Sequence, residues 1–277
     1  MKRMFLLLTG CCFALAALAQ TDTTGKSNQS DTIRVGGMII IKKGKSEGER
    51  RDHDEVQVHR RRSDYKPSNV STNWFIFDLG FANYNDQTNY GAAQAQGFVD
   101  ASVAKDHLDL RTGKSVNVNL WFFMQKLNVV KHVVNLKYGL GLETNNYRYE
   151  SDIKFLKKPT MVIMDSLTHA KDKLAADYVT IPLMLNFNFT PRREEGFGFS
   201  IGASAGYLYS SRQKFKGGSG GKYKNRGNFD LEPWKISYIA ELQFGPVKFY
   251  GSYATRSMFK KGLDQTPYTV GIRFSNW

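Results

Sequence analysis

Few side chains in this sequence have the types and spacing that catalysis needs. The nearest approach to a nucleophilic Ser/His/acid set is the segment 165–169, which holds Asp165, Ser166 and His169. Such a set works only when its side chains are held within hydrogen-bond reach of one another. We expect this segment to be a flexible loop that does not hold them. The sequence therefore predicts no catalytic residues, and we expect that the protein is not an enzyme.

The residue types that bind metals are also poorly placed. The chain has five histidines, His53, His59, His107, His132 and His169. No two of them have the spacing that would bring them together as metal ligands on one strand face. Both cysteines, Cys11 and Cys12, lie within an apolar N-terminal segment, so a processed chain would contain no thiolate ligand. We predict no metal site and no cofactor.

The N-terminal segment has the three parts of a secretory signal peptide. A basic head at residues 1–3 precedes an apolar run over residues 4–18. At the end of this run, Ala17 and Ala19 supply the small residues of a cleavage site. We predict a signal peptide over residues 1–19 that is cleaved after Ala19. A retained membrane anchor and a lipoprotein signal ending at Cys11 are the alternatives.

Residues 20–73 form a polar segment with few aromatic side chains. Lys, Arg, Asp and Glu alternate over residues 42–66, and such a composition buries too little apolar surface to fold alone. The β-prone patch at residues 32–41 predicts one short strand or hairpin. We interpret 20–73 as a mostly unstructured periplasmic tether.

From Trp74 to Trp277 the pattern changes to eight apolar-alternating segments. We predict strands over residues 74–84, 115–124, 133–149, 178–190, 197–211, 234–245, 247–256 and 268–275. In the fourth, the odd positions from Val179 to Phe189 are all apolar, and the even positions are mostly polar or small. Side chains alternate faces along a strand, so each segment has one apolar face.

This alternation also suits a soluble sandwich or a lipocalin-like barrel, but two features favour a membrane. Aromatic residues gather near the ends of the apolar faces and aliphatic ones in the middle, as the two interfaces of a bilayer select. Short connections also alternate with long ones, and the long connections are residues 85–114, 150–177, 214–233 and 257–267. We predict an all-β fold, an eight-stranded antiparallel transmembrane β-barrel over 74–277, located in the outer membrane with its N-terminal segment in the periplasm.

The polar strand faces carry charges of both signs in mid-strand. They are Asp78, Lys137, Glu143, Lys235, Glu241, Lys248 and Arg273. An eight-stranded barrel is just wide enough for side chains to fill it, so these charges would point into a narrow lumen. Buried charges are costly unless they are paired. We predict a compensating interior network and no open pore.

A second group of charges has a single sign. The third long connection carries Lys214, Lys216, Lys222, Lys224 and Arg226 with no acid among them, within a chain of formal net charge +14. At the outer surface these cations would meet the phosphates of lipids, including lipopolysaccharide. We predict a lipid-phosphate site here, with a solvated loop as the alternative. A nucleic acid is a poor partner outside the cytoplasm.

One segment is familiar. The run 178–185, Tyr-Val-Thr-Ile-Pro-Leu-Met-Leu, followed by a Gly-rich fifth strand, resembles the PorT-like outer-membrane barrels, as does the segment 31–37 after the signal. The resemblance implies fold and location more than activity, since some members serve protein secretion. We expect a structural or interaction role, as an accessory of an envelope complex with a protein partner. The alternatives are a narrow channel, a small-molecule or lipid-binding barrel, and a lipid-modifying enzyme.

Overall fold

The computed structural model describes residues 32–35, 38–41, 68–191, 196–217 and 221–275. The chain divides into two compact units, Met1–Ser63 and Asp64–Trp277. The predicted signal peptide and most of the predicted tether lie outside the described residues. In the first unit, strands β1 (Thr32–Val35) and β2 (Met38–Ile41) pair in an antiparallel hairpin within the β-prone patch.

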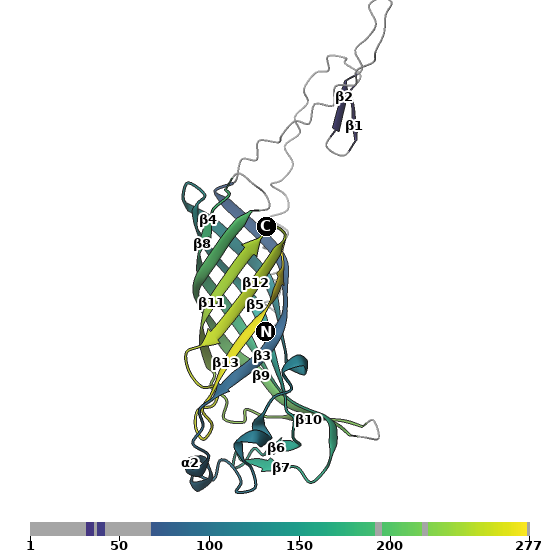
Figure 1. Cartoon of the computed structure of the whole chain (residues 1–277), viewed down its shortest axis with the longest axis vertical. Helices are drawn as coiled ribbons and strands as arrows, with labels where there is room; N and C mark the ends of the chain where they lie inside the picture. The colour runs from purple at the N-terminus through teal and green to yellow at the C-terminus, as the bar shows by residue number, and fades with distance from the viewer. Residues whose placement is uncertain (1–31, 36–37, 42–67, 192–195, 218–220, 276–277) are drawn as a thin grey trace, which may run out of the picture. The chain divides into compact units, whose positions relative to one another are not determined.

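In the second unit, eight antiparallel strands form a closed ring (Figure 1). In ring order they are β3 (Val70–Asp86), β4 (Val116–Val130), β5 (Val134–Arg148), β8 (His169–Asn188), β9 (Phe197–Gly217), β11 (Trp234–Phe244), β12 (Val247–Ala254) and β13 (Gln265–Phe274). Each strand pairs with the next, and β13 pairs back to β3. The ring therefore leaves no free sheet edge, and the predicted eight-stranded barrel is confirmed.

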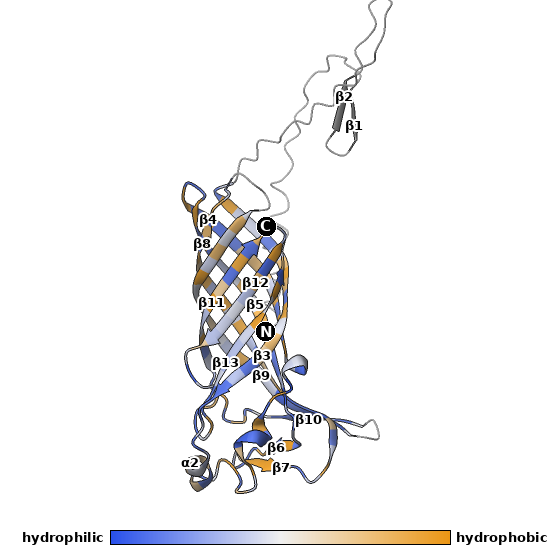
Figure 2. Ribbon diagram, in the orientation of Figure 1, coloured by the Kyte–Doolittle hydropathy of each residue, from blue (hydrophilic) through white to orange (hydrophobic). Residues whose placement is uncertain are grey.

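The barrel wall has an apolar outer surface and a polar inner one. On β8, the side chains of Ile181 and Leu183 are 56% and 55% exposed, whereas Thr180 and Met184 on the alternate positions are buried. Figure 2 shows the same alternation of orange and blue along the strands. The period of two in the sequence thus separates the outer surface from the lumen.

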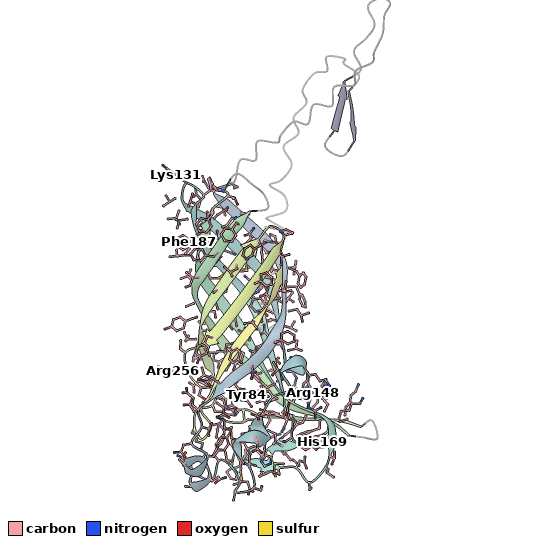
Figure 3. All side chains as sticks on the ribbon, viewed as in Figure 1. Tyr84, Lys131, Arg148, His169, Phe187 and Arg256 are labelled. Carbon is pink, nitrogen blue, oxygen red and sulfur yellow. The ribbon has the colours of Figure 1, made fainter. Side chains whose placement is uncertain are left out.

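The two ends of the barrel differ in their connections. At one end, which we call the turn end, neighbouring strands are joined by short turns, such as Gly245 and Pro246 between β11 and β12. Gly245 has a φ of 56°, which glycine adopts without strain. At the opposite end, the loop end, the connections are long. Figure 3 places Lys131 and Phe187 at the turn end and Tyr84 and Arg148 at the loop end.

Aromatic side chains gather on the outer surface near both ends. The rings of Phe197 and Phe244 lie 5.0 Å apart at the turn end, and those of Tyr207 and Trp234 lie 5.0 Å apart towards the loop end. Aliphatic residues such as Ile201 occupy the surface between them, where β9 runs from one aromatic pair to the other. This order is typical of a surface that meets the two interfaces of a bilayer.

The seam between the first and last strands of the ring is unusually tight. Gly80 of β3 lies directly opposite Gly271 of β13. A Cβ atom on Gly80 would lie 2.6 Å from the Oη atom of Tyr250 and 2.8 Å from the Cα atom of Gly271. The two glycines therefore make room for the Tyr250 ring inside the barrel.

Pro182 lies within β8 without a bulge. The β8–β9 register runs through the Pro182–Ser204 pair without a shift, and its irregularities lie between His169 and Lys171 and between Asp177 and Tyr178. On the other side of β8, pairing with β5 is interrupted between the Tyr138–Leu183 and Gly141–Thr180 pairs. The missing N–H of proline is thus accommodated by a gap in one ladder, with no inserted residue.

The long connections are folded. They contain α2 (Tyr90–Ala95), the 3-10 turns η1 (Lys105–Leu108) and η2 (Thr112–Lys114), and the strand pair β6 (Ile153–Phe155) and β7 (Val162–Met164). We call residues 87–115, 149–168, 227–233 and 255–264 the cap (Figure 1). Its buried core takes side chains from every one of these four segments, among them Phe98, Phe155, Phe229 and Phe259.

The third long connection also contains regular structure. Strand β9 continues to Gly217 and pairs with β10 (Lys222–Arg226), so that Lys214, Lys216, Lys222 and Lys224 lie on strands and not on a loop. None of the helices in the described ranges is long and apolar enough to span a membrane.

Candidate functional site

The lumen near the turn end contains a chain of four alternating charges. Arg273 forms two hydrogen bonds to Asp78, Nε to Oδ1 at 2.7 Å and Nη2 to Oδ2 at 2.8 Å. Its Nη1 atom donates to Oε2 of Glu241 at 2.5 Å, and Nζ of Lys137 donates to the other oxygen of Glu241, also at 2.5 Å. The four groups come from four strands and sum to zero charge, so each buried ion is compensated.

Asp78 is the most heavily bonded member of this chain. Its side chain is fully buried, and its Oδ2 atom accepts further hydrogen bonds from Nε1 of Trp121 at 2.7 Å and Nδ2 of Asn119 at 3.2 Å. The Arg273 guanidinium also lies 5.4 Å from the centre of the Trp121 ring. Paired, hydrogen-bonded and stacked, the Asp78–Arg273 pair is well suited to burial.

A second ion pair lies nearer the loop end. Lys235 of β11 donates to Oε1 of Glu143 on β5. Glu143 also accepts from Nδ2 of Asn145 at 2.9 Å and from Oγ1 of Thr180 at 3.3 Å. The pair ties two strands together across the lumen.

Lys248 differs from the other six predicted interior charges. It is buried at the turn end, where its Nζ atom donates to Oγ of Ser275 at 2.5 Å and to the carbonyl of Ser275 at 3.3 Å. The ion pairs of Glu241 are with Lys137 and Arg273.

Three asparagines connect the two groups of charges. Asn145, bound to Glu143, accepts from Nδ2 of Asn117 at 2.8 Å, and the same nitrogen donates to Oδ1 of Asn119 at 3.1 Å. Asn119 in turn donates to Asp78. Our sequence reasoning considered only charged residues and missed this ladder. The alternate positions of Asn117 and Asn119, on the same face of β4, are the signal that could have found it.

Strand β9 contributes space to the lumen. Its inward positions are small, namely Gly198, Ser200, Gly202, Ser204 and Gly206. The side chains of the other strands fill that space. A cavity of about 30 Å³ remains between Glu143, Thr180, Glu241 and Arg273, which is room for about one water molecule. This cavity has no room for a larger solute.

The cap is held together by an aromatic cluster around Phe155. Its ring stacks on Phe259 with centroids 5.9 Å apart and contacts the edge of Phe229 at 5.8 Å. Phe155 and Phe259 come from different long connections, so the cluster joins these segments over the loop end. Packed aromatic pairs of this kind contribute about 0.5–1.5 kcal/mol each beyond their buried area.

A buried polar group fixes the cap to the barrel strands. Gln213 of β9 donates to the carbonyl of Ile153 at 2.8 Å and accepts from the backbone N–H of Phe155 at 2.9 Å. It also donates to Oδ1 of Asp172 at 2.9 Å, and Oδ2 of Asp172 accepts from the N–H of Ile153 at 3.2 Å. Burial in the cap raises the pKa of Asp172 to about 8.

The Asp165–His169 segment is ordered, which corrects our expectation that nothing fixes its geometry. The Nε2 atom of His169 lies 3.0 Å from Oδ2 of Asp165, and its ring packs 4.7 Å from Phe215. Ser166 is exposed and makes no hydrogen bond to His169 in the described structure. Over the same ranges, no cluster of His, Cys, Asp and Glu could hold a metal ion.

The closed ring with its apolar belt defines a β-barrel of the outer-membrane type. Residues 89–255 match the family model described as outer membrane protein beta-barrel domain. This match spans more than half of the chain, and the chain belongs to that family. The structure adds β3 and β13, which lie outside the matched residues and close the ring. The protein is therefore an outer-membrane β-barrel protein.

Two solved structures were also compared with the chain. Both are of Ail, the attachment invasion locus protein of Yersinia pestis, one of them in complex with the heparin analogue sucrose octasulfate. They are 13% and 12% identical to this chain, cover 73% of it and 98% of their own length, and give TM-scores of 0.31 and 0.29. No curated protein matches the sequence. The assignment rests on the family match.

The shared position of Glu241 between two cations gives a first prediction. Replacing Glu241 with Ala leaves Lys137 and Arg273 facing each other without their common carboxylate. We expect a loss of about 3–5 kcal/mol in the free energy of unfolding, as for other broken buried pairs. Urea unfolding in micelles, followed by tryptophan fluorescence, measures it. Glu232→Ala, at a half-buried acid of the cap, is the control, and an equal small loss in both variants would contradict the network.

The raised pKa of Asp172 predicts a pH dependence of the cap. Between about pH 4, where an unfolded Asp titrates, and pH 8, the folded cap keeps a proton that the unfolded segment has released. Its stability must therefore fall as the pH rises through this window. We expect faster exchange of the β6 amide hydrogens at pH 8 than at pH 5, after correction for intrinsic rates. Asp172→Asn should abolish the difference, whereas Asp106→Asn, at an exposed acid of the cap, should leave it; a persistent difference in Asp172→Asn would refute the assignment.

Proposed function

We propose that this protein is a non-conducting outer-membrane barrel with a structural or interaction role, an accessory of an envelope complex that presents its cap to a protein partner. The observation that supports the proposal most is the filled lumen, in which the four-charge chain from Lys137 to Asp78 crosses the barrel. A barrel whose interior is filled by paired side chains has no path for solutes. No catalytic role is part of the proposal.

The proposal includes an orientation. Outer-membrane barrels have short turns on the periplasmic side and long connections outside, so we assign the turn end to the periplasm and the cap to the cell exterior. β3 begins at the turn end with Val70, which would put residues 20–69 of the predicted tether in the periplasm after cleavage of the signal peptide at Ala19. The alternative roles of a narrow channel and of a small-molecule binder both require an accessible lumen.

Conductance distinguishes these roles. We expect the purified protein to give no steady conductance in planar lipid bilayers, because the 30 Å³ cavity admits about one water molecule. A variant with Lys137, Glu241 and Arg273 all replaced by Ser should leak, provided that heat-modifiable gel mobility shows it to be folded. A stable, large open state of the unaltered protein would overturn the filled-lumen proposal.

The cations of β9 and β10 support a second part of the proposal, contact with outer-membrane lipids. In the assigned orientation, Lys214, Lys216, Lys222, Lys224 and Arg226 lie outside the membrane beyond Tyr207, one of the aromatic residues of the outer surface. Each cation near an anionic surface contributes on the order of 1 kcal/mol. We propose that they bind phosphates of lipopolysaccharide.

Replacing Lys214, Lys216, Lys222 and Lys224 with Gln tests this contact. We expect less co-purified lipopolysaccharide and a weaker dependence on salt, because exposed charges are screened within about 8–10 Å at ordinary ionic strength. Lys157→Gln with Lys158→Gln, at two exposed lysines between β6 and β7, is the matched control. Equal amounts and equal salt dependence in the unaltered protein and the four-site variant would mean that these cations are merely solvated.

A further inference from the structure

Beyond the barrel, strands β8, β9 and β10 continue as a three-stranded sheet made of residues 169–177, 211–217 and 222–226. We call this the extension. Its register aligns cations across the strands: Lys173 lies opposite Lys214, which lies opposite Lys224. Arg148, the last residue of β5, lies opposite Lys173 and lengthens the row to four cations. Residues directly opposite in an antiparallel pair point to the same face.

Two more rows repeat this arrangement on either side. Lys216 lies opposite both Lys171 and Lys222, and Arg212 lies opposite Arg226. Because side chains two positions apart share a face, all three rows lie on one face of the extension. This basic face holds nine cations: Arg148, Lys171, Lys173, Arg212, Lys214, Lys216, Lys222, Lys224 and Arg226. Arg148, Lys171, Lys173 and Arg212 are not among the cations that the sequence suggested.

The opposite face of the extension is occupied by the cap. Gln213 bonds to the backbone of Ile153 and Phe155 in β6, and Nδ2 of Asn225 donates to the carbonyl of Phe155 at 3.0 Å. In Figure 1, β6 and β7 lie beyond β10, farther from the barrel. The basic face is therefore the face of the extension that β6 does not cover.

Gathering these cations costs stability. Adjacent strands lie about 4.8 Å apart, and like charges directly opposite each other on a sheet are destabilising. Among the nine, within the described structure, Arg212 alone forms an ion pair, with Asp177. Burial, together with the nearby charges of Lys171 and Lys214, lowers the pKa of Lys173 to about 8. A bound anion would offset this repulsion.

We propose that the basic face binds a ligand carrying several phosphate groups, and that the β8 cations Lys171 and Lys173 belong to the site as fully as the cations of β9 and β10. This inference deepens the lipid-phosphate part of the proposed function and rests on it for the residues of β9 and β10. Neighbouring cations within a row lie about 5 Å apart across strands, and successive rows lie about 7 Å apart along the strands, which suits several phosphates at once. The phosphates come either from lipopolysaccharide in the same leaflet or from a soluble polyphosphate.

The experiment uses the full-length protein in nanodiscs and compares two double variants. Lys171→Gln with Lys173→Gln removes charge from β8, and Lys214→Gln with Lys216→Gln removes it from β9. We expect each to weaken binding to vesicles containing lipopolysaccharide by roughly 10- to 30-fold. Lys171→Arg with Lys173→Arg keeps the charges and should retain binding. The Lys157→Gln, Lys158→Gln control should bind like the unaltered protein, and heat-modifiable mobility verifies folding of every variant.

Each outcome decides between the claims. If the β9 variant loses binding and the β8 variant does not, the lipid contact stands and the extended site is overturned. If neither double variant loses binding, both the lipid contact and the extended site are overturned. Equal binding to vesicles with dephosphorylated lipopolysaccharide also overturns the extended site. Direct binding of soluble polyphosphate, lost in both double variants, supports the site with a free ligand as its source, whereas binding to phosphorylated vesicles alone supports the headgroup.

Discussion

The burial of charge inside a closed ring is the constraint on which this structure depends. Asp78 is fully enclosed, and an isolated carboxylate there would cost several kcal/mol. Arg273 compensates it with two parallel hydrogen bonds, and Glu241, which accepts from the third nitrogen of the Arg273 guanidinium, is in turn compensated by Lys137. The pairing fixes the register of β13 against β3, and through Glu241 it also fixes the position of β11. The same ion pairs therefore fix the strand register of the barrel and keep its lumen neutral.

The other strands are adapted to this polar interior. The small inward residues of β9 leave the volume that long side chains from β5, β11 and β13 occupy, and the asparagines of β4 and β5 satisfy the carboxylates that the cations do not saturate. At the loop end the interior changes from polar to apolar, because Tyr147 and Tyr178 belong to the apolar core that continues into the cap. The cap therefore closes the barrel with the same core that holds its own segments together.

The barrel strands could be predicted well from the sequence because the alternation of apolar and polar residues is a local pattern. Alternation with a period of two identified all eight ring strands, and it placed Glu143 and Glu241 on the polar face. It could not pair them, because partners such as Lys137 and Glu241 are 104 residues apart and their meeting depends on the register of intervening strands.

The cap was beyond sequence reasoning for a related reason. Its core is assembled from four separate connections, none of which has a periodic pattern of its own. The hairpin of β9 and β10 was missed although Lys214 and Lys216 flank the buried Phe215 in strict alternation. We gave more weight to the density of charge than to its period, and so interpreted a strand as a loop.

The ion pair between Asp78 and Arg273 also makes the first strand of the ring dependent on the last. The two residues are 195 positions apart and belong to the first and last strands of the ring. A chain that lacks β13 leaves Asp78 without its cation and β3 with β4 as its single neighbour in the ring. The carboxylate then lies on an open sheet edge, at the position where Gly80 meets Gly271 in the complete ring. Loss of the last strand alone therefore removes both the pairing and the charge compensation of the first.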